Sequence, residues 1–397
     1  MVERRNIALI TLDSLRADHC SFMGYHRKTT PTIDKMAKKG LYFEIAVPSG
    51  VATNPSMFGV HTGNYALTSA DDYNGKHWRQ EFRHNITIAE ILSKKGYTTC
   101  AVNSNVAAST YFGFNKGFKY FIDLAPDTLP NRKVLRFFRY IKEIYNGTGV
   151  SRPWEDYYDK ILKCVSSAKK PYFLWVLLMD THIPYIPPRK FRNHCNFISI
   201  CYSNWLAFQG PFWTYIEKLG KKFIDAKNAY DDCIRYADGF IKRLWEDLKD
   251  DDPIFIIHGD HGEGFGEHGY YYHPFPILYE EFTHVPLIIY NADIKGKVDY
   301  PVSLRQIPAT IMELIGEKNE FPSRSMIEEK NYYVICKVFD RGKRKVAVRL
   351  KNWKFITGQR NEDELYNLKK DPYEQENVID EHPDLAKELR KIVQAHI

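Results

Sequence analysis

The chain contains no long apolar run. None of its 397 residues falls in a stretch of the roughly 18 apolar residues that a membrane-spanning helix needs. Near the N-terminus, the short apolar run Ile7–Leu12 ends at Asp13, which makes it too short and too quickly acidic for a signal peptide. The sequence therefore predicts neither a membrane span nor a secretory leader.

Cysteines are few, odd in number and scattered, and no two of them form a C-x-x-C pair. The seven are Cys20, Cys100, Cys164, Cys195, Cys201, Cys233 and Cys336. A disulfide framework normally uses an even number of cysteines at compact spacings, and secreted proteins are where such frameworks occur. We therefore expect reduced thiols and a cytoplasmic protein.

The sequence also lacks a basic block, an internal repeat and a low-complexity linker. Its net charge of +7 arises from 56 basic and 49 acidic side chains spread along the chain, which gives no support for a nucleic-acid partner. A mildly positive field suits an anionic substrate, although ordinary solvated surfaces explain the same number. Hydrophobic residues at 44% and charged residues at 26% are typical of a folded protein.

Apolar and β-branched runs alternate with helical patterns, which predicts an α/β sheet. The expected strands are Ile7–Leu12, Tyr97–Val102, Tyr172–Met179, Ile254–Ile257 and Val285–Tyr290. One helix should begin at Pro31 after Thr30 and end at Gly40, and a second should cover residues 86–95.

The length favours one large domain and one small domain, because single cores rarely grow beyond about 250–300 residues. We place the large domain at residues 1–316 and a small α+β subdomain at 317–397, with strands near 332–338, 345–350 and 353–357 and a closing helix at 383–393. Residues 131–154 and 190–222 are rich in aromatic and basic residues without clean periodicity. We interpret both as insertions, either lids or ordinary packed excursions.

Three of the predicted strands end in side chains that bind metals or transfer protons. The residues that follow them are Asp13 after the first, Asp180 and His182 after the third, and His258, Asp260 and His261 after the fourth. Ligands of open α/β sheets bind outside the carboxyl ends of the strands. A single aspartate there is usually a helix cap, but together these endings predict one shared site. Imidazole beside carboxylate brings zinc or manganese into range.

A second element is the segment around Thr53, which places a hydroxyl two residues ahead of Pro55 and predicts a short helix ending near Gly63. The N-terminus of a helix offers free N–H groups to an oxyanion, and a metal-bound hydroxyl can act as a nucleophile. The alternative is that Thr53 only caps the helix.

These residues resemble the sulfatase family of the alkaline phosphatase superfamily. The resemblance lies in three regions. The first is Leu12-Asp13-Ser14-Leu15-Arg16-Ala17-Asp18-His19, followed by Gly24-Tyr25-His26-Arg27-Lys28-Thr29-Thr30-Pro31. The second is Asp260-His261-Gly262-Glu263 through Gly266-Glu267-His268-Gly269, followed by Tyr279-Glu280-Glu281 and Val285-Pro286-Leu287-Ile288-Ile289, and the third is the tail 364–378 with the sequence ELYNLKKDPYEQENV. It covers nearly the whole chain, in the family's order.

The resemblance implies a three-layer α/β/α sandwich with a mostly parallel central sheet. It also implies a divalent metal ion, manganese or zinc rather than calcium or magnesium, held by Asp13, Thr53, Asp260 and His261. His182 and His273 match residues that contact the substrate or protonate the leaving group, and Asn54 would bind the substrate beside Thr53. A second metal through Asp180, His268 or His273 remains open.

Two features, one in the segment 53–57 and one at Ser14, differ from the family pattern. Sulfatases carry cysteine or serine in a C-x-P-x-R segment, whose first residue becomes formylglycine; here the segment is Thr53-Asn54-Pro55-Ser56-Met57. Threonine cannot give that aldehyde, and the arginine is absent. Ser14 stands where many sulfatases carry another aspartate of a calcium site. The set is closer to the threonine-nucleophile branch, which includes phosphoglycerol transferases and phosphodiesterases.

We therefore predict a metal-dependent hydrolase or transferase of phosphate esters. Thr53 would take the phosphoryl group, His182 or His273 would protonate the leaving oxygen, and water or an acceptor hydroxyl would complete the reaction. The expected substrate is a small molecule or an anionic ester on a glycan or lipid head group. The alternatives are a sulfatase in the strict sense and an inactive binding protein that retains the fold.

Overall fold

The computed structural model describes residues 4–124, 153–201, 204, 224–273, 276–328, 330–340, 343–357 and 363–396. Within these ranges, none of the helices combines the length and apolar character needed to cross a bilayer. Most of the two predicted insertions, 131–154 and 190–222, lies outside the described residues.

A sheet of eight strands forms the centre of the molecule, in the order β11-β2-β10-β7-β1-β6-β4-β5. The strands are β1 (Ile7–Leu12), β2 (Leu41–Phe43), β4 (Thr98–Asn103), β5 (Tyr120–Asp123), β6 (Tyr172–Leu178), β7 (Ile254–Gly259), β10 (Leu287–Tyr290) and β11 (Gly296–Val298). Among these strands only β10 runs antiparallel to its neighbours. The prediction of a mostly parallel α/β sheet is confirmed, whereas the short strands β2, β5 and β11 were not predicted.

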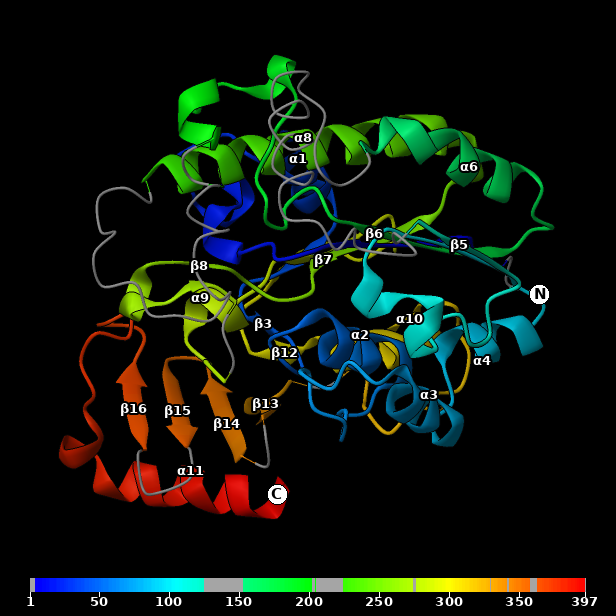
Figure 1. Cartoon of the computed structure of the whole chain (residues 1–397). Helices are drawn as coiled ribbons and strands as arrows, with labels where there is room; N and C mark the ends of the chain where they lie inside the picture. Colours follow the sequence, from blue (N-terminus) through cyan, green and yellow to red (C-terminus); the bar gives the residue numbers. More distant parts are fainter. Residues whose placement is uncertain are drawn as a thin grey trace.

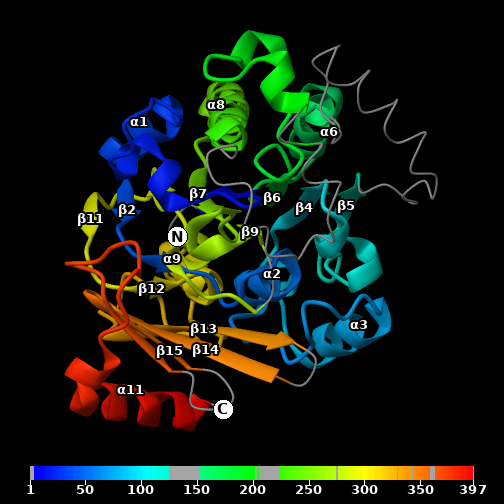
Figure 2. The same ribbon diagram turned by 60° about the vertical axis from the view of Figure 1, so that its left-hand side comes forward.

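Helices cover both faces of this sheet, so that the catalytic part has three layers (Figures 1 and 2). One face carries α1 (Pro31–Lys39), α6 (Glu155–Ser166) and α8 (Ile224–Asp247). The other carries α2 (Thr53–Thr62), α3 (Gly75–His84), α4 (Ile88–Lys94) and α10 (Ile307–Leu314). The alkaline-phosphatase-like α/β/α fold expected from the sequence is therefore present.

Two separate hydrophobic cores explain why the central strands are apolar throughout. Alternate residues of β1 point to opposite faces, with Ile10 in the core beneath α8 and Leu9 in the core beneath α2. Trp175 of β6 joins the second core and is fully buried. A strand covered on both faces has no polar side. Its sequence is therefore a continuous run of apolar residues rather than an alternation of apolar and polar residues.

The predicted helix boundaries follow from local sequence signals. The helix α1 begins at Pro31, whose missing N–H costs nothing in the first turn, and Gly40 follows its last residue. A capping box formed by Thr87 and Glu90 fixes the start of α4. Both helices lie where the sequence predicted them, to within two residues.

The C-terminal part is an antiparallel sheet of four strands backed by one helix. Its elements are β13 (Tyr333–Asp340), β14 (Lys343–Leu350), β15 (Trp353–Thr357), β16 (Glu364–Asn367) and α11 (Pro383–His396). One face of this sheet packs against the catalytic part and the other against α11 (Figure 1). The predicted α+β tail is confirmed, with β16 as an additional strand. The domain division at residue 316 stays a prediction.

Four short strands, together with one single-turn helix, complete the frame of the site. They are the two-residue strand pairs β3 (Ala46–Val47) with β12 (Val302–Ser303) and β8 (Gly264–Phe265) with β9 (Tyr271–Tyr272), which form two small ladders. A single-turn helix α9 (Glu280–Thr283) precedes β10. The β8–β9 hairpin and α9 hold the loop that follows β7.

Candidate active site

The carboxyl ends of β1, β6 and β7 meet at one edge of the sheet. Leu12, the last residue of β1, pairs with Leu178 of β6 on one side and with Gly259 of β7 on the other. Because the three strands are parallel and in register, the residues that follow them must emerge side by side. The adjacency predicted from the three strand endings is therefore present.

Asp13, Asp260 and His261 form a group that can hold a metal ion. Each offers one ligand atom, and these atoms lie within 4.8 Å of one another. All three side chains are almost completely buried. The Nε2 atom of His261 lies 3.8 Å from Oδ1 of Asp13 and 3.7 Å from Oδ2 of Asp260. Two carboxylates and one imidazole suit a divalent transition metal.

Backbone contacts orient these ligands. The amides of Ser14 and His261 donate to Oδ1 of Asp260 at 2.9 Å and 2.8 Å, and Ser14 adopts a positive φ of 58° that turns its amide toward that oxygen. The other oxygen of Asp260 is buried and has no hydrogen-bond partner among the described residues. The ring of His261 contacts the carbonyl of Gly262 through Nδ1 at 2.9 Å, which leaves Nε2 as the ligand atom.

The electrostatics of this group also fit a cation. Burial raises the pKa of Asp260 to about 7, and the nearby charge of Asp13 adds to the effect. Burial would raise the pKa of Asp13 as well, but His182 and His261 hold it below its usual range. Burying two carboxylates, one of which has an oxygen without a hydrogen-bond partner, costs folding free energy unless a positive charge lies beside them. The residues present therefore fit a divalent metal ion.

Thr53 is the first residue of α2 and lies against the metal group. Its hydroxyl is 3.3 Å from Oδ2 of Asp13 and accepts a hydrogen bond from Nδ2 of Asn105 at 3.1 Å. The N-cap residue is Ala52, and no side chain caps the helix. The alternative that Thr53 serves only as a helix cap is therefore wrong. Asn54, the next residue, is also buried.

The start of α2 is tied directly to the loop after β7. The hydroxyl of Ser56 donates to the carbonyl of Asp260 at 2.6 Å, and Ser49 donates to the carbonyl of Pro55 at 2.9 Å. These bonds fix the helix N-terminus, with its outward-pointing N–H groups, beside the metal group. Met57, which occupies the place of the missing arginine, is completely buried in the core and does not replace its charge.

His182 and His273 lie together at the same site. Their ring centroids are 5.0 Å apart, and the rings of His261 and His273 are 5.1 Å apart. The Nδ1 atom of His182 contacts the carbonyl of Ile183 at 2.5 Å. The Nδ1 atom of His273 lies 3.0 Å from Oε1 of Glu263. Two imidazoles close to the metal group are suitably placed to exchange protons with an ester bound there.

Two residues at the site were missed by the sequence analysis. Asn105 contacts both Thr53 and Oδ2 of Asp13, and Thr181 donates to the backbone carbonyl of Asp13. Asn105 follows β4, the strand beside β6, so the rule that identified Asp13 could also have identified it. Thr181 adjoins the predicted Asp180 and His182, but nothing in its residue type indicated a role.

Two residues considered for a second metal lie elsewhere. Among the described residues, Asp13, Asp260 and His261 are the only group close enough to hold an ion. Asp180 is buried, and burial together with the charge of Glu155 raises its pKa to about 7. His268 contacts Oε1 of Glu281 and the carbonyl of Glu374, each at 2.9 Å.

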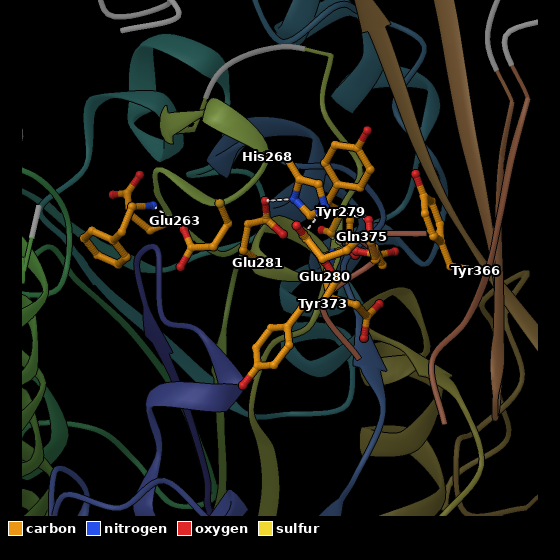
Figure 3. Close-up of polar contacts among 12 residues, drawn as sticks. Glu263, His268, Tyr279, Glu280, Glu281, Tyr366, Tyr373 and Gln375 are labelled. Carbon is orange, nitrogen blue, oxygen red and sulfur yellow. Dashed lines mark hydrogen bonds and ion pairs between the residues drawn. The ribbon is translucent and has the colours of Figure 1, made fainter. Parts of the chain in front are cut away.

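The C-terminal tail packs on the loop that carries His261 and His273. Figure 3 shows His268 of this loop against the ring of Tyr279, with centroids 3.8 Å apart, and beside Glu281. On the tail side, the buried Lys354 of β15 lies 3.1 Å from Glu280 and 3.0 Å from Glu374. The family-like tail segment is thus part of the frame of the site, although none of its residues belongs to the metal group.

Gly262 permits the close approach of this loop to α9. Its amide donates to the carbonyl of Phe282 at 2.9 Å, and a Cβ atom here would lie 1.9 Å from the carbonyl oxygen of Glu281. No residue with a side chain fits without moving the backbone. The glycine in the Asp-His-Gly-Glu segment therefore has a structural reason.

The fold and the metal group together define an enzyme of the alkaline-phosphatase-like type that acts on esters. The chain matches the sulfatase family, described as "Sulfatase", over residues 5–317, and it belongs to that family. Members of this family are typically metal-dependent, in agreement with the buried group Asp13, Asp260 and His261.

Individual relatives cover nearly the whole chain. An arylsulfatase of Clostridium perfringens is 27% identical over 98% of this chain and 93% of its own length. The phosphoethanolamine transferase EptA of Escherichia coli O157:H7 is 23% identical over 73% of this chain and 47% of its own. Among solved structures, a phosphonate monoester hydrolase of Agrobacterium radiobacter shares the fold with a TM-score of 0.75, 18% identity, and coverage of 99% of this chain and 96% of its own.

Proposed function

We propose that this protein hydrolyses anionic esters with Thr53 as the nucleophile, at the centre formed by Asp13, Asp260 and His261. The observation that carries the proposal is the position of the Thr53 hydroxyl, 3.3 Å from Oδ2 of Asp13 and at the N-terminus of α2. A side chain with a different purpose, such as a helix cap, would bond to its own helix instead.

Each residue of the site has a definable task in this reaction. Asp13, Asp260 and His261 would hold a divalent metal ion, with manganese or zinc preferred over calcium or magnesium because an imidazole is present. When bound, such an ion lowers the pKa of a nearby hydroxyl and polarises the ester oxygen. Asn105 orients the Thr53 hydroxyl, and the free amides at the start of α2 face the developing negative charge.

Proton transfer falls to His182 and His273. A contact at Nδ1 fixes the orientation of each ring. The partner of His182 is the carbonyl of Ile183, and the partner of His273 is the carboxylate of Glu263. Thr53 gives up its hydroxyl proton and bonds to the phosphorus or sulfur, while one of the histidines protonates the leaving oxygen. In the second step the same histidine takes a proton from water, and the water oxygen attacks the phosphorus or sulfur and breaks its bond to Oγ1 of Thr53, which releases the acid. Asn54 and the same two histidines would bind the anionic group of the substrate.

The choice between phosphate and sulfate esters rests on two opposing observations. Threonine cannot be converted to formylglycine, so its ester must be broken by attack at phosphorus or sulfur, and that chemistry favours phosphate or phosphonate esters. The comparisons favour the alternative, because six of the seven related curated proteins are named as sulfatases. We propose phosphate esters as the first candidate class and sulfate esters as the second.

An inactive binding protein is the least supported alternative. It was motivated by Met57, yet the metal group, the Thr53 hydroxyl and two histidines are assembled in one place.

Substitution of Thr53 tests the nucleophile. We expect Thr53→Ala to reduce kcat by roughly 10³-fold or more in the presence of manganese, because the covalent step is lost. Thr53→Ser keeps the hydroxyl and should retain much of the activity. The rates are measured with aryl phosphate, aryl phosphodiester and aryl sulfate substrates in parallel, and a chelator should abolish all of them.

A partition experiment distinguishes a covalent intermediate from direct attack by water. With an acceptor alcohol added, an enzyme bearing a Thr53 ester must divide product between water and alcohol in one ratio, whatever the leaving group was. Undiminished turnover by Thr53→Ala, or a ratio that changes with the leaving group, would contradict the nucleophile assignment. Faster turnover of the aryl sulfate than of both phosphates would establish the second candidate class instead.

A further inference from the structure

Ser14, directly after Asp13, has a backbone conformation that its surroundings must maintain. Its φ of 58° lies in the left-handed region, which is uncommon for a residue other than glycine, and its side chain is completely buried. Such a conformation persists only where neighbouring contacts fix it, and it often marks a functional site. The contacts of Ser14 therefore indicate what its conformation serves.

Ser14 connects the two carboxylates of the metal group. Its amide donates to Oδ1 of Asp260 at 2.9 Å, and its hydroxyl donates to Oδ1 of Asp13 at 3.0 Å. The angle φ sets the direction of the amide relative to the side chain and the carbonyl group, so a change in φ would separate this pair of bonds. The conformation of Ser14 thus holds Asp13 and Asp260 in their relative positions.

A tyrosine from a distant part of the chain holds the carbonyl of Ser14. Tyr230 lies on α8, which covers one face of the sheet (Figure 1), and its hydroxyl donates to the carbonyl oxygen of Ser14 at 2.7 Å. The same hydroxyl accepts the amide hydrogen of Arg16 at 2.9 Å. A phenolic hydroxyl can donate and accept at once, so a single side chain fixes two backbone groups of the turn after β1.

Packing fixes the ring of Tyr230, so that its hydroxyl has little freedom. The side chain is completely buried, and its ring lies against the rings of Phe265 and Tyr185, with centroids 5.0 Å and 5.4 Å apart. The next residue of the turn is also closely held, because a Cβ atom at Gly259 of β7 would lie 2.4 Å from the carbonyl oxygen of Leu15. The turn after β1 is therefore in close contact with both α8 and β7.

We propose that Tyr230 is a positioning residue of the metal centre, which acts by holding Ser14 in the conformation that spaces Asp13 and Asp260. Its hydroxyl contacts the backbone of the turn rather than a ligand side chain. A metal ion binds more tightly where its ligands are already in place, because binding then needs no rearrangement. Loss of the hydroxyl should therefore weaken metal binding. The inference rests on the metal group of the proposed function.

A tyrosine with a purely structural role leads to a different expectation. Removal of the Tyr230 hydroxyl takes a partner from the carbonyl of Ser14 and from the amide of Arg16, and the loss of buried hydrogen bonds lowers stability wherever they lie. A change in stability therefore does not distinguish the two roles. Metal affinity does, because only a positioning role connects it to Tyr230.

The test compares metal binding by the full chain of the wild type and of Tyr230→Phe, which keeps the ring and removes only the hydroxyl. Each protein is treated with a chelator, dialysed and titrated with manganese chloride in a calorimeter, and then with zinc chloride in a second experiment. We expect Tyr230→Phe to bind each ion roughly tenfold more weakly than the wild type. Ser14→Ala, which removes the bond to Asp13, should show a loss of similar size.

Turnover at saturating metal provides a second measurement. Tyr230→Phe changes no group assigned to the nucleophile, to metal binding or to proton transfer. With manganese in large excess, its kcat for an aryl ester should therefore return to within about threefold of the wild-type value. The defect should appear in the manganese concentration needed for half-maximal activity.

Tyr158→Phe is the matched control. Tyr158 of α6 is also buried, and its hydroxyl donates to Oδ2 of Asp247 at 2.8 Å, so no residue of the metal group takes part in its hydrogen bond. We expect its affinity for manganese to equal that of the wild type. Thermal unfolding of the chelator-treated proteins should show that both tyrosine variants are folded, with midpoints lowered by only a few degrees.

Three results would overturn the proposal. One is wild-type affinity for manganese in Tyr230→Phe, whatever the change in its thermal stability. Another is an equal loss of affinity in Tyr158→Phe, which indicates a general effect of reduced stability. Both of these leave the proposed function intact. The last is a wild type that binds neither manganese nor zinc, which would overturn the metal centre of the proposed function as well.

Discussion

Lys354 is the clearest place to test how the C-terminal tail is held. Its side chain is fully buried, and its ammonium lies 3.1 Å from Glu280, 3.0 Å from Glu374 and 3.0 Å from the hydroxyl of Thr283. We consider Lys354→Met, which keeps the length of the side chain and removes the charge. Glu280 retains a second partner, because Arg349 donates to its two oxygens at 3.1 Å and 3.3 Å. Glu374 is the carboxylate left without a cation.

Removing one partner of a buried ion pair typically costs about 3–5 kcal/mol, because the remaining charge is desolvated and uncompensated. We expect a loss of that size in the free energy of unfolding at about pH 8. Protonation of Glu374 limits this loss of stability, because a neutral carboxyl group no longer needs a cation beside it. Burial already raises the pKa of Glu374 to about 7 against the pull of Lys354, and the charge of Glu280 adds to the increase.

The pH dependence follows from this raised pKa. A carboxyl group that holds its proton more tightly when folded contributes stability below its unfolded pKa of 4.5 and loses that contribution as the pH rises through about 7. Lys354→Met moves the pKa of Glu374 further upward. The variant should therefore lose only about 1–2 kcal/mol near pH 5, where Glu374 is neutral and only the hydrogen bonds are missing.

Urea unfolding followed by tryptophan fluorescence measures these differences, since the slope and midpoint give the free energy of unfolding. The double variant Lys354→Met/Glu374→Gln removes both charges and should return to within about 1 kcal/mol of the wild type. Lys351→Met, at an exposed lysine of the same subdomain, is the matched control and should change stability by less than about 0.5 kcal/mol. Two results would refute the reasoning. One is only a small loss of stability in Lys354→Met at pH 8, and the other is a loss that Glu374→Gln does not reverse.

Two further predictions concern the active site and the core. Asn105→Ala should reduce kcat by roughly 10- to 100-fold with little change in thermal stability, because Asn105 orients Thr53 and Asp13; steady-state kinetics with an aryl ester would contradict this if kcat were unaffected. His61 is buried against Trp175, its Nε2 has no hydrogen-bond partner among the described residues, and burial lowers its pKa from 6.5 to about 3. Its contribution to stability is full above pH 6.5 and is lost as the pH falls toward 3, by up to about 1.4 kcal/mol per pH unit. In unfolding experiments between pH 6.5 and pH 3, the stability of His61→Leu should fall less steeply with decreasing pH than that of the wild type. The same pH dependence in both proteins would contradict the lowered pKa of His61.

The position of the active site is largely readable from the sequence. Asp13 and Asp260 each follow an apolar run, and such runs become central parallel strands because both faces of the sheet are covered. Once the strands are parallel, their carboxyl ends must share one edge, so local pattern alone brings these two carboxylates together. The same rule placed His182 after the third predicted strand, whereas His273 came only from the family resemblance, and no sequence spacing shows that these two histidines lie close together.

The sequence by itself determined the fold class, the metal group and the segment carrying Thr53, since each depends on residue type and on a short local pattern. Only the tertiary structure showed that Thr53 contacts Asp13 rather than capping its helix, that Asn105 joins them, and that His268 belongs to the tail contact. The contact of Tyr230 with the backbone of Ser14 was equally hidden, because these residues come from distant elements. Contacts between residues far apart in the chain depend on the packing of whole elements, and no local pattern records that packing.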